Sequence, residues 1–295
     1  MPQMPSELFA RLPEPGALER LAAAAAQAYG APSPAHVVPA PGTQILLPLV
    51  AALVPPGRAS VLGPTYAEHL RAAALVGHRV AEVAAPGPLA GADLAVVVNP
   101  NNPDGRIVAR AELLACAGEL RSRGGMLVVD EAFMDAGPAG TSLCGDVGLG
   151  NIVVLRSFGK FFGLAGLRLG FALAAPDAAA RLRASLGPWA VSGAAIGVGE
   201  AALRDRAWRE DTRARLARAA QRLDQLLTAA GLDVVGGTSL FRLVRTTAAS
   251  ELFLHLGRAG ILVRRFDEQP PWLRFGLPAG EEAWHRLRTA LAAFA

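Results

Sequence analysis

Short apolar runs alternate with helical stretches over residues 35–175, and this alternation restricts the possible folds of the 295-residue chain more than any other feature. Four runs are typical of buried strands: 59–62, 94–98, 126–129 and 152–155. Alanine- and leucine-rich stretches separate them. Strands alternating with helices predict an α/β fold of three layers, in which helices cover both faces of a mostly parallel sheet.

The pattern changes after residue 193. We predict a long helical segment over 194–230, followed by strands and helices of a smaller α+β C-terminal domain. Its expected elements are strands at 233–235, 240–244, 261–265 and 272–276 and helices at 250–259 and 281–294. The expected buried stripe of the long helix is Leu203, Trp208, Leu216, Leu223 and Leu227. The domains are then 34–193, a large domain, and 1–33 plus 194–295, a small domain with the long connecting helix.

Composition excludes several classes of protein. The net charge of +4 is weak evidence for nucleic acid, and the arginines of 194–230 fit a solvated helix face better than a site for an acidic partner. Cys116 and Cys144 stand alone, so no metal site is expected. No apolar stretch approaches the roughly 20 residues of a membrane span, and Met1–Pro15 lacks the apolar run of a signal peptide. We therefore expect a cytoplasmic protein without a nucleic-acid, membrane or metal partner.

A polar or glycine-containing turn follows each of the four strands. In open parallel sheets, ligands bind outside the carboxyl ends of the strands, so these turns should converge on one site. The four turns are Gly63–Tyr66, Asn99–Gly105, Asp130–Phe133 and Arg156–Lys160.

Lys160 is the single lysine among 29 basic side chains. A chain that otherwise uses arginine is expected to keep a lysine where the amine must lose a proton and act as a nucleophile, which a guanidinium cannot do. The alternative is a surface lysine left by chance. The neighbouring turns favour the nucleophile.

Pyridoxal phosphate needs an imine-forming amine, a carboxylate at the pyridine nitrogen, a flat group against the ring and donors for the phosphate. Asp130 follows an apolar strand and could hold the pyridine nitrogen protonated, although a helix N-cap is a common role for such a residue. Asn102 could donate to the ring hydroxyl oxygen, or simply belong to a proline-rich turn. Tyr66 could stack on the ring, or be a rim aromatic.

Candidate phosphate ligands lie on both sides of Lys160 and at an earlier turn. Ser157 precedes it by three residues and Arg168 follows it by eight. Gly42 and Thr43 open an apolar helix whose free N–H groups could bind phosphate, although many helices begin with such residues. No rival motif is present: there is no GxGxxG after the first strand, no Walker lysine and no GxSxG elbow.

At these residues the chain resembles the fold type I pyridoxal phosphate-dependent enzymes, which are similar to aspartate aminotransferase. The motifs NPNNPDG, VVDEAF, SFGK, GLRLG and LRFGLP occur in the family's order and spacing. The resemblance implies that Lys160 binds the cofactor as a Schiff base, that Asp130 pairs with the pyridine nitrogen, and that Asn102 contacts the ring hydroxyl. It also implies that Tyr66 stacks and that Arg274 binds the substrate α-carboxylate. The residues implied to hold the phosphate are Gly42, Thr43, Ser157 and Arg168.

Within the family, RLPEPGALERL, APGTQ, GPTYAEH and VDEAFMD look closest to the threonine-phosphate decarboxylases of cobalamin biosynthesis, which are similar to histidinol-phosphate aminotransferases. The reaction implied is loss of carbon dioxide from L-threonine O-3-phosphate, giving (R)-1-aminopropan-2-yl phosphate, in a homodimer. The alternatives are an aminotransferase and a degenerate or truncated cofactor-binding protein. The candidates for the substrate phosphate are Arg264 and Arg265, which could instead form surface ion pairs with Asp267 and Glu268.

The chain departs from the family's pattern at three places. Phe133 stands where many relatives have a tyrosine that donates to the ring hydroxyl, and Leu12 where aminotransferase relatives have a tyrosine that reaches the partner subunit's phosphate. The family also has a segment before RLPEP that covers the substrate. Here RLPEP already begins at Arg11. We therefore expect one of two explanations: the start codon lies further upstream, or the protein is a shortened version of the enzyme with impaired activity.

Overall fold

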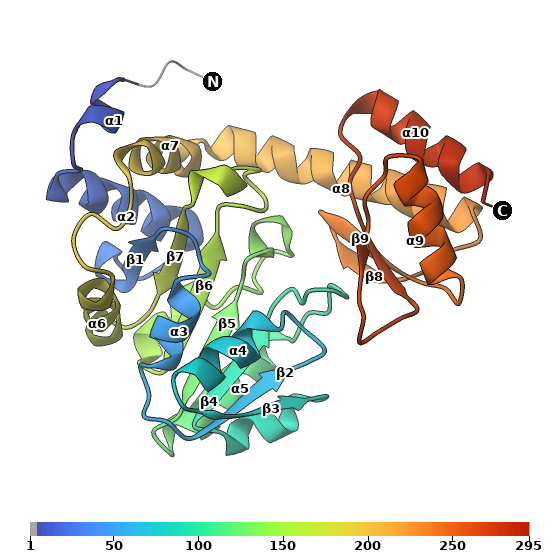
Figure 1. Cartoon of the computed structure of the whole chain (residues 1–295). Coiled ribbons are helices and arrows are strands. Elements are labelled where there is room, and N and C mark those ends of the chain that lie inside the picture. The colour runs from blue at the N-terminus through green and yellow to red at the C-terminus, as the bar shows by residue number, and fades with distance from the viewer. Residues whose placement is uncertain (1–4, 295) are drawn as a thin grey trace. The chain divides into compact units, whose positions relative to one another are not determined.

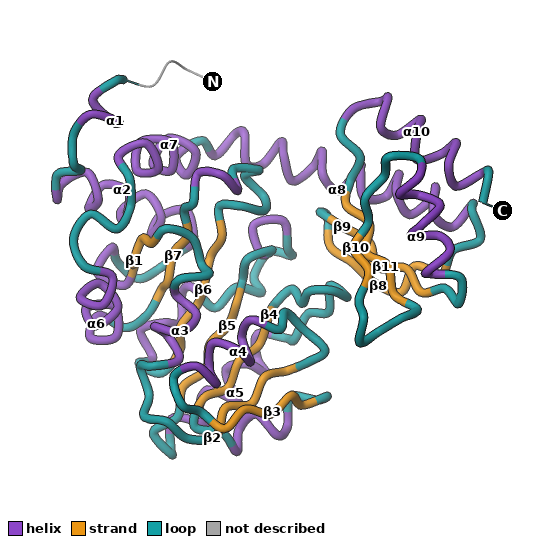
Figure 2. The backbone as a smooth tube through the Cα atoms, in the orientation of Figure 1, coloured by secondary structure: helices purple, strands orange, loops and turns teal. Residues whose placement is uncertain are grey.

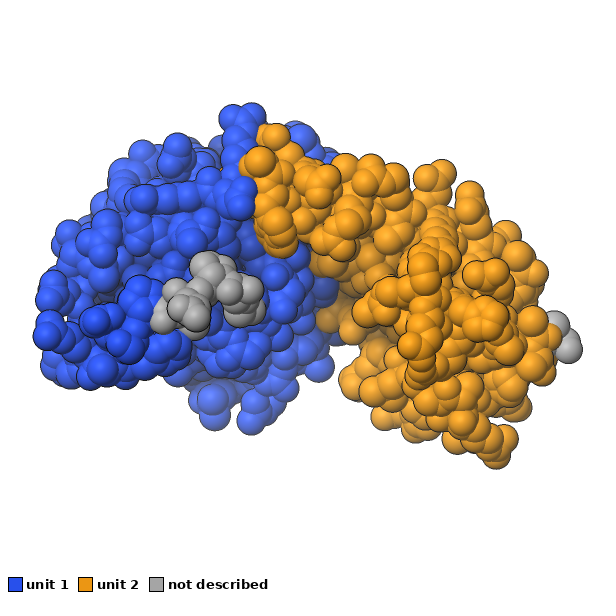
Figure 3. Space-filling model, turned by 90° about the horizontal axis from the view of Figure 1, so that it is seen from above, with its two compact units in different colours: residues 1–100, 107–206 blue, residues 101–106, 207–295 orange. Residues whose placement is uncertain are grey.

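The computed structural model describes residues 5–294, so the expected domain assignment of residues 1–4 and 295 lies outside the described part. Contacts divide the chain into two compact units, coloured separately in Figure 3. The first unit contains the residues up to Pro100 together with Ile107–Arg206. The second contains Asn101–Arg106 and the residues from Ala207 onward.

The first unit is built on a seven-stranded sheet with the order β1-β7-β6-β5-β4-β2-β3. Its strands are β1 Val37–Ala40, β2 Arg58–Leu62, β3 Arg79–Val83, β4 Leu94–Val98, β5 Met126–Asp130, β6 Ile152–Ser157 and β7 Gly170–Leu173. Strands β3, β2, β4, β5 and β6 are parallel neighbours, while β7 runs antiparallel to both β6 and β1. The prediction of a mostly parallel sheet is confirmed.

Helices cover both faces of this sheet (Figures 1 and 2). They are α2 Pro15–Tyr29, α3 Leu46–Ala51, α4 Glu68–Leu75, α5 Arg110–Arg121, α6 Pro176–Leu186 and α7 Gly193–Arg204, while the short helix α1 Glu7–Ala10 packs against α7. Short 3-10 helices lie between them: η1 Pro34–His36, η2 Gly87–Gly91, η3 Met134–Ala136, η4 Cys144–Leu149 and η5 Ala165–Leu167. The predicted α/β fold with three layers is therefore confirmed.

Side chains alternate between the two faces along the central strands, as pleated geometry requires. Met126 and Val128 of β5 and Val153 and Leu155 of β6 pack in one core cluster with residues of α3, α4 and α6. Asp130 and Ser157 continue that alternation, so they belong to the same face. Glu131 and Arg156 have the opposite parity and lie on the other face. Neighbouring residues at the strand ends are thus separated by the sheet.

The N-terminal residues group differently from our expectation. We expected 1–33 to join the C-terminal segment, whereas the contacts place α2 in the first unit, packed against β1 and α7. Its Leu21 is fully buried and lies against α7 at Gly199, where a side chain would meet it. The alanine-rich face of α2 therefore covers the first sheet.

The second unit contains a four-stranded antiparallel sheet with the order β10-β11-β9-β8. Its elements are α8 Arg206–Ala229, β8 Asp233–Thr238, β9 Phe241–Arg245, α9 Ala249–Arg258, β10 Arg264–Arg265, β11 Trp272–Gly276 and α10 Gly280–Ala292. Leu223, Leu227, Leu252, Leu273 and Leu287 belong to one buried cluster, which gives this unit a core of its own. The prediction of a smaller α+β C-terminal part is confirmed.

The long helical segment expected over 194–230 is two helices, because the chain leaves helical geometry at Asp205. Leu203, Leu223 and Leu227 are buried as expected, and Leu216 is half-buried. Trp208 is 38% exposed, so its placement in the buried stripe was wrong. No helix among residues 5–294 is long and apolar enough to cross a membrane.

The segment Asn101–Arg106 lies between β4 and α5 in sequence but packs in the second unit. It is closed on itself, since Gly105 N donates to Asn101 O (2.9 Å) and Asn101 N to Arg106 O (2.8 Å). Gly105 and Gly236 let its backbone lie directly against β8: a Cβ at Gly105 would collide with Gly237 O, and one at Gly236 with Asp104 O. We call this segment the docked loop.

Candidate active site

The carboxyl ends of β2, β4, β5 and β6 lie at one edge of the first sheet, since these neighbouring strands are parallel. Their turns, which contain Tyr66, Asn99, Asp130 and Lys160, therefore lie at that edge, as the strand pattern predicted. The turn after β4 continues into the docked loop, which carries Asn102 and belongs to the second unit.

Asp130 is 5% exposed and is held by two donors. Its Oδ2 lies 2.9 Å from Nε2 of His69, and its Oδ1 accepts a hydrogen bond from Ala132 N at 3.0 Å. A buried carboxylate held in one orientation can stabilise a positive charge on a ligand beside it. Sequence reasoning missed His69, which is 4% exposed and lies on α4. Its position three residues after Tyr66, at the start of an amphipathic helix, was the available signal.

Lys160 is exposed, and its Nζ lies 5.5 Å from the ring centroid of the buried Phe133. The amine is thus accessible to a ligand while an apolar ring contacts it from one side. Phe133 presents only a ring here, so it offers no hydroxyl to a cofactor, as the sequence indicated.

Tyr66 is 40% exposed at the same edge, and its ring stands edge-on to the His69 ring at 6.1 Å between centroids. Its hydroxyl donates to Oε1 of Gln44 at 3.0 Å, and Gln44 Nε2 donates to Glu68 at 2.7 Å. Burial, together with the charges of Glu68 and Asp130, raises the pKa of Tyr66. Tyr66 is therefore a neutral aromatic with an accessible face.

The expected phosphate ligands meet beside the β1–β7 pair. Arg168 has a left-handed backbone (φ 51°), and the space at Gly42 (φ 89°) is taken by its guanidinium: a Cβ there would lie 2.5 Å from Nη2. A Cβ at Gly170 would lie 2.7 Å from Thr43 N. Ser157 accepts a hydrogen bond from Gly159 N at 3.3 Å. Hydroxyl, backbone N–H and guanidinium donors fit a phosphate dianion.

Gly42 provides a test of this cradle. We expect Gly42→Ala to weaken pyridoxal phosphate binding about tenfold, because the Cβ displaces the Arg168 guanidinium and a charge-assisted hydrogen bond is lost. Fluorescence titration of apoprotein with the cofactor measures it. Gly30→Ala is the matched control: Gly30 also has a positive φ (74°), but nothing lies within 4 Å of its Cβ position. It should cost about 1 kcal/mol of stability through backbone strain and leave the affinity unchanged.

In the second unit, Arg274 donates to Oδ1 of Asn102, and its guanidinium carbon lies 5.0 Å from the Phe241 ring centroid. Arg264 pairs with Arg274 in the β10–β11 register, so the two side chains are on the same face of the sheet. Burial, and then the charge of Arg264, lower the pKa of the half-buried Arg274. Arg265 instead forms an ion pair with Asp267 at 2.9 Å.

A sequence profile of the aminotransferase class I and II family matches residues 6–291. The chain belongs to this family. Among its relatives, the threonine-phosphate decarboxylase of Pseudomonas aeruginosa is 46% identical over 297 residues, which cover 100% of this chain and 88% of the relative. That of a Sinorhizobium species is 43% identical over 298 residues, 99% and 87% of the two chains. The histidinol-phosphate aminotransferase structure from Clostridium acetobutylicum has a TM-score of 0.86 at 20% identity, covering 98% and 91%.

Membership in the aminotransferase class I and II family makes the chain a pyridoxal phosphate-dependent enzyme and confirms the resemblance inferred from its motifs. The residues present fit that cofactor: an accessible amine, a buried oriented carboxylate, an aromatic face and a cradle that a Cβ at Gly42 would fill.

Proposed function

We propose that this protein decarboxylates L-threonine O-3-phosphate to (R)-1-aminopropan-2-yl phosphate, a step of cobalamin biosynthesis. Two relatives named threonine-phosphate decarboxylase match almost the whole chain at more than 40% identity. Aminotransferase activity of the histidinol-phosphate type is the second candidate, supported by the structural likeness to such an enzyme.

The observation that carries the proposal is the pair Arg264 and Arg274, two guanidinium groups opposite each other on one face of the small sheet. Like charges in this position repel, and an anionic ligand would relieve the repulsion. L-threonine O-3-phosphate has both a carboxylate and a phosphate. Two cations on one face fit these two anionic groups, and the identity of more than 40% to two threonine-phosphate decarboxylases favours this substrate over histidinol phosphate. Arg265, already paired with Asp267, is dropped from the set of substrate ligands.

Each proposed site residue has a separate task. The amine of Lys160 holds the cofactor covalently and later supplies the proton that takes the place of the lost carboxylate at the α-carbon. Asp130, oriented by His69, keeps the pyridine nitrogen protonated. Arg274 binds the substrate carboxylate and Arg264 the substrate phosphate. When bound, pyridoxal phosphate supplies an electron-withdrawing ring that accepts the electron pair of the broken bond.

Gly42, Thr43, Ser157 and Arg168 hold the cofactor phosphate in this proposal, Tyr66 stacks against the ring and Asn102 contacts the ring hydroxyl. Because Phe133 has no hydroxyl, Asn102 is the side chain that fills that role. Arg274 donates to Oδ1 of Asn102, which leaves the amide N–H groups as donors to the cofactor.

The reaction is tested by supplying purified protein with L-threonine O-3-phosphate and pyridoxal phosphate. We expect carbon dioxide and an aminopropyl phosphate without any added 2-oxo acid. Strict dependence on a 2-oxo acid would replace the decarboxylase by an aminotransferase. A protein that takes up no pyridoxal phosphate would remove both candidates.

Arg264 and Arg265 form a matched pair for the substrate phosphate. We expect Arg264→Ala to raise KM for L-threonine O-3-phosphate at least about tenfold, since a charge-assisted hydrogen bond to a dianion is lost. Arg265→Ala should leave KM nearly unchanged, because this side chain forms an exposed ion pair. Equal effects of the two substitutions on KM would contradict the assignment.

We further propose a cytoplasmic homodimer, which the family resemblance implied. Light scattering after size-exclusion chromatography would give the mass of the assembly directly. A mass of about 30.5 kDa, that of one chain, would contradict the dimer.

A further inference from the structure

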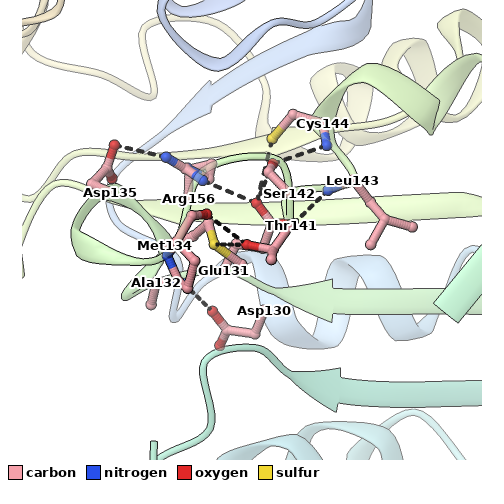
Figure 4. A network of polar contacts seen from close by, with 11 residues as sticks. Asp130, Glu131, Ala132, Met134, Asp135, Thr141, Ser142, Leu143, Cys144 and Arg156 are labelled. Atoms are coloured by element: carbon pink, nitrogen blue, oxygen red, sulfur yellow. Dashed lines mark hydrogen bonds and ion pairs between the residues drawn. The ribbon is translucent and has the colours of Figure 1, made fainter. Parts of the chain in front are cut away.

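A buried cluster of charged side chains lies on the sheet face opposite Asp130. Arg156, Glu131 and Asp135 are 4%, 0% and 1% exposed. Arg156 Nη1 donates to Glu131 Oε2 at 2.9 Å, and Nη2 donates to Asp135 Oδ1 at 2.7 Å. Figure 4 shows Arg156 between the two carboxylates, with Asp130 pointing away from them. The family motifs assigned no task to this cluster.

Glu131 is held from further sides. Its Oε1 accepts from Leu143 N at 2.7 Å, and its Oε2 accepts from the Ser142 hydroxyl at 2.6 Å. Burial raises the pKa of Glu131, while Arg156 and these hydrogen bonds lower it. Arg156 has a third neighbour besides the two carboxylates: its guanidinium carbon lies over the ring of Tyr29 in α2, 4.3 Å from the ring centroid. The guanidinium is therefore fixed by two carboxylates and one ring.

The two carboxylates flank the turn that follows β5. Glu131 is two residues before Phe133 and Asp135 two residues after it, and Glu131 directly follows Asp130. Arg156 lies on β6, directly before Ser157 and four residues before Lys160. One guanidinium thus joins the turn that carries Asp130 and Phe133 to the segment that carries Lys160.

We infer that Arg156 is a positioning residue: through Glu131 and Asp135 it fixes the turn after β5 relative to the turn after β6. It thereby sets the placement of Asp130 and Lys160 around the cofactor. A planar guanidinium reaches two separated carboxylates with two different nitrogens, whereas the donors of a lysine all lie on one nitrogen and are not fixed in a plane. The inference rests on the proposed roles of Asp130 and Lys160.

Arg156→Lys in the full chain tests this. The variant keeps the positive charge but loses one of the two ion pairs, to Glu131 or to Asp135. Asp130 and Lys160 are then displaced from their positions around the cofactor. We expect the dissociation constant of pyridoxal phosphate to rise at least about tenfold, because displacing Asp130 or Lys160 weakens a charged contact with the cofactor. The pH midpoint of the bound cofactor's visible absorbance should shift as well, since it depends on the distance between Asp130 and the ring.

Asn151→Ala is the matched control. Asn151 is buried next to the start of β6, at the other end of the same strand, and its amide donates to Ala117 O (2.8 Å) and Gly125 O (3.2 Å). Its loss should lower Tm while the cofactor's dissociation constant and absorbance midpoint stay at wild-type values. Asp135→Asn is a second, isosteric variant that weakens the ion pair between Arg156 and Asp135. It provides the test if Arg156→Lys folds poorly.

The inference is overturned if Arg156→Lys or a folded Asp135→Asn lowers Tm as Asn151→Ala does but leaves both cofactor constants unchanged. Wild-type protein distinguishes this failure from failure of the proposed function. If wild-type protein takes the cofactor on Lys160 and the variants match it, only the inference about Arg156 falls. If wild-type protein takes up none, both fall.

Discussion

Lys160→Ala is expected to lower the rate of carbon dioxide release at least about a thousandfold, because the side chain both holds the cofactor and moves a proton at the α-carbon. No other lysine exists in the chain to replace it. The variant should also lose the visible absorbance of covalently held pyridoxal phosphate. Initial rates and spectra of the purified protein measure both effects.

Lys160→Arg separates charge from nucleophilicity. The guanidinium keeps the positive charge next to Phe133 but cannot lose a proton to form the covalent bond. We expect it to be as inactive as the alanine variant and to fold equally well, since residue 160 is exposed. Borohydride treatment of the wild-type protein followed by peptide mapping should place the cofactor on Lys160. Activity in the arginine variant would contradict the assigned role.

Asp130→Asn is expected to reduce kcat about a hundred- to a thousandfold, because an amide cannot balance the positive charge of the pyridine nitrogen. The substitution keeps the size of a buried side chain that contacts His69, so the fold should survive. The pH dependence of the cofactor's absorbance should change together with kcat. Steady-state kinetics and a spectral titration measure the two effects.

Asp93→Asn is the control for Asp130→Asn. Asp93 precedes β4, at the opposite edge of the sheet, and its Oδ2 accepts a hydrogen bond from Arg58 N at 2.6 Å. Removing its charge should change stability but neither kcat nor the spectrum. A fall in kcat of the same size in both variants would mean that Asp130 acts through the stability of the fold, against the proposed role.

Long apolar runs made the central sheet predictable. Strands β4, β5 and β6 are buried on both faces, so their sequences are almost continuous runs of apolar residues. The strands predicted from the sequence did not include β1, which contains Pro39, or β7, which has four residues. They also omitted β3, a mostly exposed edge strand whose sequence, Arg79–Val83, has no buried face. Short, proline-containing or exposed strands depend on their neighbours more than on their own composition.

The strand ends predicted which segments of the site meet, but not which side chains pair. His69 contacts Asp130 from 61 positions away, and Arg274 reaches Asn102 from 172 positions away. Arg264 and Arg265 are adjacent and chemically identical, and only the register of β10 on β11 separates them. Pairings of this kind depend on tertiary geometry, which local pattern does not determine.

The docked loop has a consequence for how this protein can be recombined. The chain passes between its compact units at three places, Pro100–Asn101, Arg106–Ile107 and Arg206–Ala207, rather than at one. A chimaera that takes residues 207–295 from a relative would set the foreign β8 against the native docked loop, whose fit requires glycines on both sides. The second unit therefore cannot be exchanged with a single crossover, because residues 101–106 must come from the same parent as residues 207–295.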